Sequence, residues 1–344
     1  MADKPCYEDI IEDTVNSGLH AMVLAVGYRV GIVDAMQRLN APSTAVEISE
    51  EAQLNLRYVE EWLICMASKG IIHYENGRYK MPCSKRVQKA AHTSSVLPMF
   101  ANCFTNLETA MRNKNSNTGY KYPVLELEWL AKYRKLSNID QSWVERNIAP
   151  VISSYLRKQD MISRIPAILD FGCGYGKLAG ELATYYPQFP VFGTDIDADA
   201  IDGCLKSFKH LKFAIFNEDI KKDWQEKFDI IILMDVLHDL PDPVTVLTQV
   251  KSMLKPNGYI VTFDPNISSD ISKTIGQKMA LNHLPYSMFF CLPNSLSENP
   301  AAGHGISWGI EDREQFFIDN GFTIVNTDEH TKSDEDYYRI ILQK

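Results

Sequence analysis

Hydrophobic residues near the start of the chain recur at spacings of three and four positions. The recurrence is clearest between Leu19 and Val33, where it predicts an amphipathic helix. After an interruption at Pro42, two further apolar segments, at 44–49 and 54–66, predict two short helices. The beginning of the chain is therefore predicted to be mainly helical.

Two short apolar segments follow these helices. They cover residues 71–74 and 78–81, and Asn76 and Gly77 lie between them. Asn-Gly between strand-like segments is a strong hairpin signal, because both residues tolerate the left-handed backbone angles of a tight turn. Helix, helix and hairpin in this order predict a winged-helix-like domain, which we place at residues 1–95.

The pattern changes at Ile165, where short apolar segments begin to alternate with amphipathic ones. This alternation predicts a mostly parallel sheet with helices on both faces. The predicted strands are 167–171, 191–194, 212–216, 228–234, 259–263, 322–325 and 338–342. The last two are short and close together, which predicts an antiparallel hairpin at one edge. The predicted fold class is therefore α/β: a Rossmann-like, doubly wound, seven-stranded and mostly parallel sheet, plus the N-terminal helical winged-helix-like domain.

Two segments fall outside these patterns. Residues 96–160 mix aromatic side chains with a polar patch, and we expect a helical linker that roofs a pocket. Residues 264–309 separate the fifth and sixth predicted strands and are rich in Asn, Ser, Pro and Gly. Connections of this length are usually functional, so we expect a substrate lid within a ligand-binding domain at 161–344.

The charge of the chain bears on its partners. The chain has 344 residues and a formal net charge of -9. Nonspecific nucleic-acid binding depends mostly on Lys and Arg, so the acidic balance argues against a nucleic-acid partner. In the predicted helix at 54–66, which would be the recognition helix of a winged helix, Glu60 and Glu61 beside Arg57 would repel phosphates. We expect this domain to serve in packing or dimerisation, which predicts a homodimer.

Cysteine use and hydropathy indicate the compartment. The seven cysteines are scattered without a C-x-x-C pair, which predicts neither a disulfide framework nor a structural zinc site. The first residues show no basic leader before an apolar stretch, and Arg29 interrupts the longest apolar run. We expect a soluble, cytoplasmic protein without a membrane partner.

Three glycines at alternate positions follow the first predicted strand of the sheet. Gly172, Gly174 and Gly176 come directly after the apolar run that ends at Phe171. Glycine permits the tight turn and lets the backbone approach a ligand closely. Asp195, at the end of the next strand, can accept both hydrogen bonds of a ribose diol. The turn and the acid together predict a nucleoside site.

Further acidic residues follow the other strands. Ligands of open parallel sheets bind beyond the carboxyl ends of the strands. One acid at a strand end is often only a helix cap, but here five successive strand ends carry one. They are Asp170, Asp195 with Asp197, Glu218 with Asp219, Asp235 with Asp239, and Asp264. For Asp235 and Asp239, capping of a helix that begins at Pro241 is the alternative interpretation.

A nicotinamide dinucleotide is the alternative ligand. Read from Gly174, the sequence fits the G-x-G-x-x-A fingerprint of dinucleotide-binding folds. The strand ends near Phe171, however, so the turn begins at Gly172. Counted from there, Lys177 takes the third position, where its bulk does not suit close packing of helix on strand. A dinucleotide-dependent oxidoreductase is therefore the less favoured hypothesis.

Taken together, these motifs resemble the class I S-adenosylmethionine-dependent methyltransferases. The resemblance rests on residues 170–176, Asp195, Glu218 with Asp219, 228–231 and 254–258. It covers residues 165–344 in order. With its winged-helix-like front and the run 236–239, the chain is similar to the small-molecule O-methyltransferases that act on phenols and hydroxyindoles. Leu240 stands where those enzymes typically carry Trp.

The resemblance implies S-adenosylmethionine as the cofactor, no metal, and a small-molecule acceptor, with oxygen favoured over nitrogen or sulfur. Asp195 would hold the ribose hydroxyls, and Asp219 would accept from the adenine amino group. The residues implied in cofactor binding are Asp170, Gly172, Cys173, Gly174, Asp195, Ile196, Asp219, Ile220 and Asp235. The isoleucines would flank the adenine ring. Gly172 and Gly174 would bring the backbone against the methionine part, Asp170 would fix its ammonium group, and Asp235 would help close that end. Cys173 would pack in the turn or offer its backbone amide.

The acceptor must lose a proton during methyl transfer, and His is suited to that task near neutral pH. His238 follows the fourth strand, where the acceptor should meet the methyl group, so we predict that it is the general base. Orientation of the acceptor is its alternative role. His283 and His304 lie in the lid and are expected at the surface. A winged-helix regulator that senses S-adenosylmethionine without catalysis is a second hypothesis.

Overall fold

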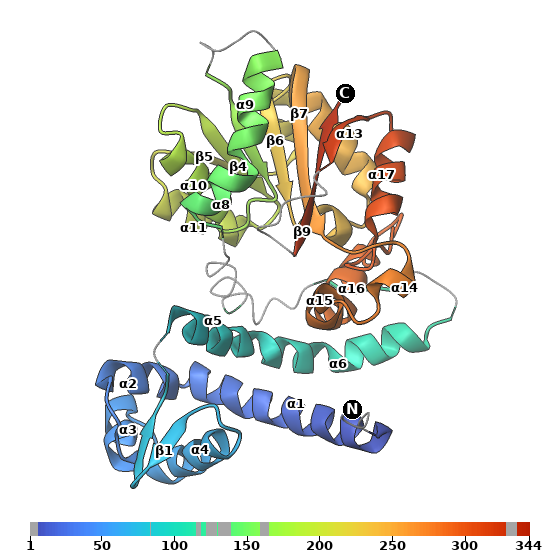
Figure 1. Ribbon diagram of the computed structural model, residues 1–344. Coiled ribbons are helices and arrows are strands. Elements are labelled where there is room, and N and C mark those ends of the chain that lie inside the picture. Colours follow the sequence, from blue (N-terminus) through green and yellow to red (C-terminus); the bar gives the residue numbers. More distant parts are fainter. Residues whose placement is uncertain are drawn as a thin grey trace. The chain divides into compact units, whose positions relative to one another are not determined.

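The computed structural model describes residues 6–82, 84–114, 118–121, 129, 139–158, 165–327 and 336–344. The chain divides into two compact units. One comprises Met1–Cys103 with Pro123–Leu136, and the other comprises Phe104–Tyr122 with Ser137–Lys344 (Figure 1). Parts of the predicted roof, at 115–117, 122–128, 130–138 and 159–160, lie outside the described residues.

The first unit is helical and carries a two-stranded wing. Its elements are α1 (Tyr7–Arg29), α2 (Ile32–Leu39), α3 (Ala45–Ala52), α4 (Leu56–Ser68), β1 (His73–Glu75), β2 (Arg78–Lys80), α5 (Lys85–Thr93) and η1 (Ser94–Val96). β1 and β2 pair in antiparallel fashion, and Asn76 and Gly77 at their turn adopt φ values of 49° and 75°. The predicted order of helix, helix and Asn-Gly hairpin is confirmed.

Apolar side chains from several helices hold this unit together. Val33 of α2, Ile48 of α3 and Leu63 of α4 are fully buried in one cluster. Burial of each such side chain stabilises the fold by about 1.5–3 kcal/mol. Among the described residues, no single helix has the length and hydropathy of a membrane span. α1 and α2 meet that standard only as a pair, and they are bent by 65° at their junction.

The second unit contains a seven-stranded sheet in the order β5-β4-β3-β6-β7-β9-β8. Its strands are β3 (Ile168–Phe171), β4 (Val191–Asp195), β5 (Lys212–Ile215), β6 (Phe228–Met234), β7 (Leu254–Pro265), β8 (Thr323–Thr327) and β9 (Tyr337–Gln343). The strands from β5 to β7 pair in parallel, whereas β9 is antiparallel to both β7 and β8. The predicted fold class, with its antiparallel edge hairpin, is confirmed.

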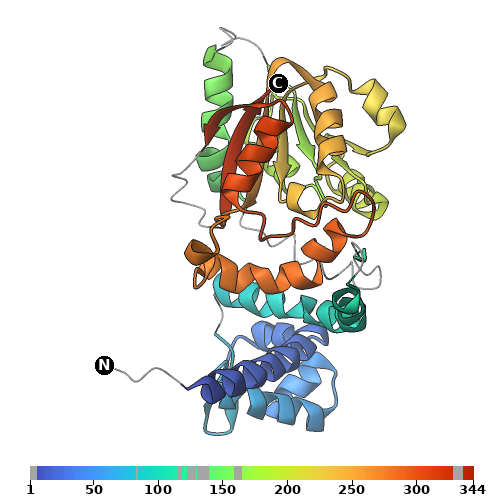
Figure 2. The same cartoon turned by 90° about the vertical axis from the view of Figure 1, so that its right-hand side faces the viewer.

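Helices cover both faces of this sheet. On β6, Ile230 and Ile232 belong to a core with residues of α8–α11, whereas Ile231 and Leu233 belong to a second core with residues of α13 and α17. Figure 2 shows helices on both sides of the sheet. The α-helices described for this unit after α6 and outside the predicted lid are α8 (Gln141–Asn147), α9 (Ala149–Lys158), α10 (Lys177–Tyr185), α11 (Ala198–Ser207), α12 (Glu218–Asp223), α13 (Pro243–Met253) and α17 (Ile310–Asp319). α6 (Leu97–Arg112) spans the boundary between the two units. Alternation of side chains along a strand explains why the central strands are apolar throughout.

The predicted lid, residues 264–309, begins at the end of β7 and is partly helical. It contains α14 (Ile271–Thr274), α15 (Lys278–Phe289) and α16 (Cys291–Ser295). The helix predicted to begin at Pro241 begins at Pro243 instead. Its N-cap is Asp242, whose Oδ1 accepts from the Thr245 N–H at 3.0 Å. Capping of this helix by Asp235 or Asp239 was therefore the wrong interpretation.

Asp229 ties three elements together at the start of β6. It is fully buried, and its carboxylate accepts from the Tyr155 hydroxyl of α9 and from the Ala167 N–H just before β3, both at 2.9 Å. Lys255 Nζ of β7 lies 2.6 Å from Asp229 Oδ2. The acid thus satisfies donors that would otherwise be buried without an acceptor.

We expect Asp229→Ala to lower the free energy of unfolding by about 3–5 kcal/mol, because it leaves buried donors without their acceptor. Asp202→Ala removes an exposed carboxylate paired with Lys206 and should change the free energy by less than about 0.5 kcal/mol. Urea unfolding followed by circular dichroism measures both values. Equal stability of the two variants would show that Asp229 does not hold these elements together.

Candidate functional site

Two of the three glycines in the turn after β3, Gly172 and Gly174, differ in what surrounds them. Gly172 has a φ of 74°, and a Cβ there would lie 2.6 Å from Val236 Cγ2. Gly174 has a φ of 50°, and a Cβ there would meet nothing within 4 Å. Packing inside the chain therefore requires glycine at Gly172. At Gly174 the backbone borders open space that a ligand can approach closely.

Asp195 lies directly beside this turn, as predicted. Its Oδ2 accepts from the Gly174 N–H at 2.8 Å, and its Oδ1 accepts from the Asp197 N–H at 2.9 Å. These bonds hold the carboxylate in one orientation. A carboxylate offers about four lone-pair sites, so it can still accept from the two hydroxyls of a ribose.

Cys173 and Asp170 face the interior of the unit. The Cys173 N–H donates to Thr194 O at 3.0 Å, and a hydrogen bond with the Cys204 thiol, together with burial, raises the pKa of the Cys173 thiol. Asp170 is 2% exposed, and its Oδ2 accepts from the Ala179 N–H at 3.1 Å. Burial raises the pKa of Asp170 to about 7; the bond from Ala179 opposes the rise and Asp195 adds to it. One oxygen of Asp170 thus caps α10.

Three predicted residues lie at the neighbouring strand ends. Ile196 follows β4 and is 82% exposed, an unusual environment for isoleucine. Asp219 is exposed in the first turn of α12, and the Ile220 N–H there donates to Asn217 Oδ1 at 3.0 Å. Because β4 and β5 pair in parallel, their carboxyl ends meet at one edge of the sheet. An exposed isoleucine and a carboxylate at this edge suit an aromatic ring that carries an amino group.

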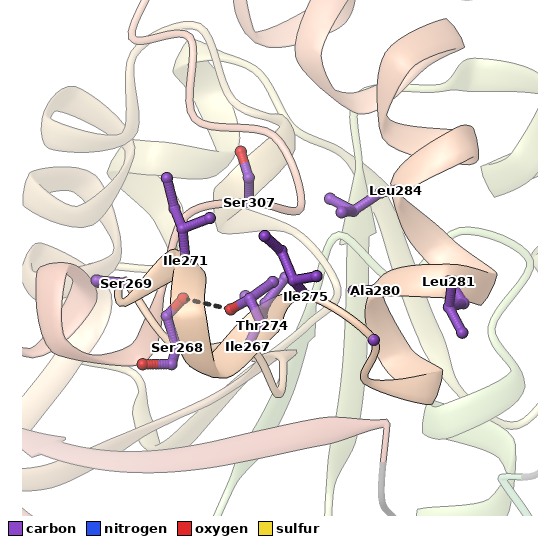
Figure 3. A pocket seen from close by; sticks show the side chains of 11 residues that line it. Ile267, Ser268, Ser269, Ile271, Thr274, Ile275, Ala280, Leu281, Leu284 and Ser307 are labelled. Carbon is purple, nitrogen blue, oxygen red and sulfur yellow. Dashed lines mark hydrogen bonds between the residues drawn. The ribbon is translucent and has the colours of Figure 1, made fainter. Parts of the chain in front are cut away.

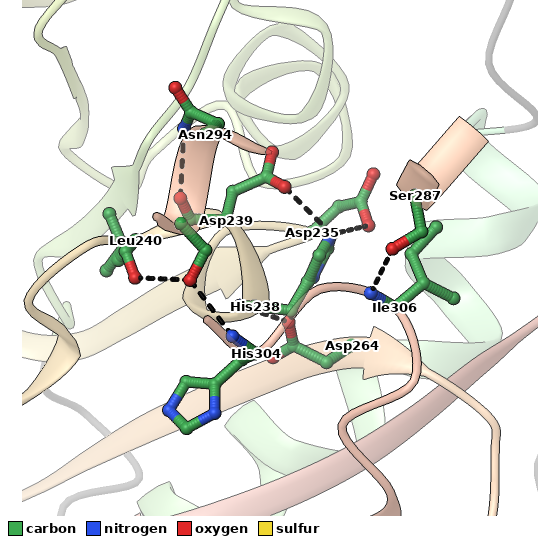
Figure 4. Close-up of polar contacts among 10 residues, drawn as sticks. Asp235, His238, Asp239, Leu240, Asp264, Ser287, Asn294, His304 and Ile306 are labelled. Atoms are coloured by element: carbon green, nitrogen blue, oxygen red, sulfur yellow. Dashed lines mark hydrogen bonds and ion pairs between the residues drawn. The ribbon is translucent and has the colours of Figure 1, made fainter. Parts of the chain in front are cut away.

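His238 lies in the short helix η3 (Leu237–Asp239) that follows β6, and it is 2% exposed. Its Nδ1–H donates to Asp264 Oδ1 at 2.8 Å (Figure 4). Asp264 ends the neighbouring strand β7 and is 1% exposed. This bond sets the orientation of the ring and leaves Nε2 to face other groups. Nε2 lies 3.7 Å from Asp235 Oδ1 and 3.4 Å from Asp239 Oδ1.

These carboxylates control the proton on His238. Burial alone lowers the pKa of His238, but Asp239, the hydrogen bonds to Asp264 and Cys291, and Asp235 together raise it well above the usual value. Below the unfolded pKa of about 6.5, His238 is charged in both states and its contribution to stability is complete. That contribution is lost as the pH rises through the higher pKa of the folded protein.

Asp235 has a strained backbone. Its φ is 60°, a left-handed conformation that costs a residue with a Cβ about 1–2 kcal/mol. Its N–H donates to Phe263 O at 2.8 Å, and the side chain is 48% exposed beside His238. Strain of this kind persists where the surrounding structure enforces it, often at functional sites.

The lid contributes a residue that the sequence did not single out. Cys291 opens α16, is 8% exposed and hydrogen-bonds to His238 through its thiol. Burial and the nearby Asp239 raise the pKa of Cys291 to about 12, although the contact with His238 opposes the rise. Nothing in the spacing of two residues so far apart predicts that they meet. For Asp264 a signal existed, since it was one of the acids expected at the carboxyl ends of successive strands.

His304 of the lid is half-buried, so the expectation of a surface position was wrong. Its ring stacks on Trp308 with centroids 3.8 Å apart and planes inclined by 5°. The backbone N–H of His304 donates to Ser295 Oγ at 3.1 Å. Burial and the positive charge of His238 lower the pKa of His304. His283, also half-buried, lies 4.0 Å from a carboxylate oxygen of Asp336.

The predicted roof meets the lid through Tyr120. Its N–H donates to Pro293 O at 3.1 Å, and its hydroxyl donates to Phe289 O at 2.9 Å. The lid also contains an apolar cavity of about 360 Å³ (Figure 3). It is lined by Ile267, Ser268, Ser269, Ile271, Thr274, Ile275, Gly276, Ala280, Leu281, Leu284 and Ser307. None of the predicted site residues lines it, so it is separate from the site at His238.

Comparison with known families bears on the identity of this site. Residues 165–337, half of the chain, match the methyltransferase domain family. Residues 18–89 match a winged helix-turn-helix domain described as Rv2258c-like. Both matches confirm the resemblance inferred from the sequence.

Three known proteins illustrate the similarity. A malonyl-[acyl-carrier protein] O-methyltransferase of Halalkalibacterium halodurans is 30% identical over 133 residues, which are 36% of this chain and 49% of that protein. The chain thus matches about half of that relative's length. A ubiquinone biosynthesis O-methyltransferase of Dinoroseobacter shibae is 27% identical over 48% of this chain and 70% of its own. Human N-acetylserotonin methyltransferase, solved with S-adenosylmethionine, shares the fold at a TM-score of 0.68 and 16% identity, covering 100% of this chain and 99% of its own.

We expect Gly174→Ala to weaken S-adenosylhomocysteine binding at least tenfold, because its Cβ would enter the open space beside Asp195. The left-handed φ should cost about 1–2 kcal/mol of stability. Gly18→Ala is the matched control, since its Cβ would also meet nothing within 4 Å but lies in helix α1 of the other unit. Calorimetric titration measures the affinity, and an unchanged value for Gly174→Ala would contradict the assignment.

Proposed function

The chain belongs to the family of S-adenosylmethionine-dependent methyltransferases, and we propose that it transfers a methyl group to an oxygen atom of a small molecule. The observation that carries this proposal is the bond between His238 Nδ1 and Asp264 Oδ1. It leaves Nε2 of a buried imidazole available to a substrate at the carboxyl edge of the sheet. A histidine oriented by a carboxylate is a common arrangement for a general base.

The residues at the glycine turn fit the proposed cofactor. The open space beside Gly174 admits the methionine part, Asp195 accepts from the ribose, and Asp219, Ile196 and Ile220 hold the adenine ring. We also assign three residues to the methionine end of the cofactor. Gly172 and Cys173 form the turn that borders it, and Asp170 binds the ammonium group of the methionine part. Asp235 closes that end. When bound, S-adenosylmethionine supplies a methyl group on a positively charged sulfur atom.

The carboxylates around His238 favour a hydroxyl acceptor. A phenolic hydroxyl has a pKa of about 10, so its proton must be removed before the oxygen becomes a good nucleophile. Proton transfer is more favourable when the pKa of the base approaches that of the acid. Asp239, Asp264 and Asp235 raise the pKa of His238 toward that of a phenol. Burial of the site excludes water that would compete with the acceptor.

A regulator that binds the cofactor without catalysis explains less of the structure. On α4, where a winged-helix regulator would contact DNA, Arg57 pairs with Glu61 on an exposed face. A buried imidazole that is paired with a carboxylate, such as His238 with Asp264, is not needed to sense the cofactor. Deprotonation of an acceptor does need a base of this kind. We therefore propose no nucleic-acid or membrane partner, no metal, and a cytoplasmic location that suits the free thiols of the described cysteines.

The proposal is tested by incubating the protein with labelled S-adenosylmethionine and a metabolite extract, followed by mass spectrometry. We expect a labelled product that carries the methyl group on oxygen. In His238→Gln we expect kcat to fall by about 10²–10⁴-fold with unchanged affinity for S-adenosylhomocysteine, because only the base is removed. His283→Gln, also in this unit, is the matched control and should keep its kcat. Unchanged turnover in His238→Gln would refute the role of the base.

The pH dependence gives a second readout. The base is active only when neutral, so a raised pKa means that kcat/KM increases with pH through the neutral range. The charged and titratable groups that face His238 are Asp235, Asp239, Asp264, Cys291 and His304. Asp239→Asn removes the largest influence that raises the pKa, so the rise in kcat/KM should move to lower pH. A profile that does not move would show that another group controls the rate.

We further propose that the protein is a homodimer through α1. Apolar residues recur on one face of this helix at helical spacing and are exposed, although exposed apolar stripes are uncommon on monomers. They are Ile11, Val15, Leu19, Met22 and Val26, between 38% and 63% exposed. A second copy that presents the same stripe would bury both faces.

We expect Val15→Glu with Leu19→Glu to convert a dimer into a monomer, because each dimer would then bury unpaired carboxylates. Asn16→Glu adds a charge at a neighbouring polar position and should leave the dimer intact. Analytical ultracentrifugation distinguishes the two states. A wild-type protein that sediments as a monomer at micromolar concentration would disprove the dimer.

A further inference from the structure

Cys291 stands at one corner of a compact cluster. Ligand atoms of His238, Asp239 and Cys291 lie within 4.8 Å of one another, and the thiol and the imidazole are hydrogen-bonded. Because Nδ1 of His238 is occupied by Asp264, the thiol faces the other ring nitrogen, Nε2. Nucleophile, base and orienting acid therefore occur in one chain of contacts.

The lid is anchored so that the thiol stays at this position. Asn294 Nδ2 donates to Asp239 O at 2.9 Å, and Ser295 Oγ donates to Leu240 O at 3.0 Å. Further along the lid, the Gly305 N–H donates to His238 O at 3.0 Å. These bonds attach α16 and the end of the lid to the turn that carries His238, so the cysteine is placed by the fold and not by a free loop.

The thiol and an acceptor compete for one atom. A neutral imidazole has a single lone pair, on Nε2 when Nδ1 carries the proton, and it accepts one strong hydrogen bond. A base must come within about 2.6–3.2 Å of the group whose proton it takes. An acceptor hydroxyl can therefore reach Nε2 only where Cys291 now contacts it.

We propose that the thiol of Cys291 occupies the acceptor position in the acceptor-free protein and is a modification site for soft carbon electrophiles. Modification of this thiol closes the acceptor site and leaves the adenosyl site open. This inference rests on the proposed function. With iodoacetamide as the probe, and at a pH at which the His238 imidazole is neutral, Nε2 takes the thiol proton. A bond forms between Sγ and the methylene carbon, and the carbon-iodine bond breaks to release iodide. Atoms and charge balance without an oxidant.

The electrophile is soft because a thiol is the nucleophile. Under the proposed function, iodoacetamide follows the same path to Nε2 that an acceptor must take. Other cysteines provide the comparison. Cys6 is exposed, whereas Cys173 and Cys204 are buried free thiols near the glycine turn that are hydrogen-bonded to each other. Reaction at Cys291 should depend on His238, since burial keeps the thiol protonated unless a base removes its proton.

The experiment treats the full-length protein with iodoacetamide and maps the modified cysteines by mass spectrometry over time. Methyl transfer to the metabolite extract and binding of S-adenosylhomocysteine are measured on the same samples. We expect methyl transfer to fall in proportion to the alkylated fraction of Cys291, while the affinity for S-adenosylhomocysteine stays unchanged. In His238→Gln, alkylation of Cys291 should slow by about tenfold or more, because the base is missing.

Variants separate this site from the other thiols. Cys291→Ala, or Cys291→Ser if the first does not fold, should lose its sensitivity to iodoacetamide, whereas Cys65→Ser should keep it. The proposal is overturned if Cys291 stays unmodified while Cys6 reacts fully, if alkylated protein keeps its turnover, or if cofactor binding is lost equally. Absence of any methylated product before treatment would instead reject the proposed function, and the effect of His238→Gln on alkylation would still decide the position of the thiol.

Discussion

The parallel pairing of β6 with β7 determines how this site is built. Met234 lies opposite Phe263 in that register, so the turn after β6 and the end of β7 emerge side by side. The Asp235 N–H donates across this junction to Phe263 O, and three residues later the chain turns His238 back onto Asp264. If the register slipped by one residue, the carboxylate would point to the opposite face of the sheet. The imidazole would then be buried without its partner.

The same edge of the sheet carries acids with opposite environments. Asp195 is half-buried, and its carboxylate is bound by backbone N–H groups beside open space. Asp264 is almost fully buried and is committed to one imidazole. Carboxylates near solvent can exchange their partners for those of a ligand, whereas a buried one needs a permanent partner. This difference separates the proposed cofactor half of the site from the proposed catalytic half.

Several features of the fold were predictable because their causes are local. Alternating strands and helices from Ile165, the Asn-Gly turn of the wing and the glycine turn after β3 each depend on neighbouring residues. The acids at strand ends were expected to gather because parallel strands place their carboxyl ends at one edge. The role of Asp170 was less predictable. Its side chain caps α10, and nothing in the strand that carries it reveals that direction.

By itself, the sequence determined the fold class and the methyltransferase family and predicted a nucleoside site, since hydrophobic periodicity and glycine spacing act over a few residues. Only the tertiary structure decided that Cys291 of the lid meets His238, that His304 stacks inward on Trp308, and that three carboxylates surround one imidazole. These contacts join residues far apart in the chain. They depend on how α16 packs against the turn after β6, and packing of that kind leaves no periodic signal in a single sequence.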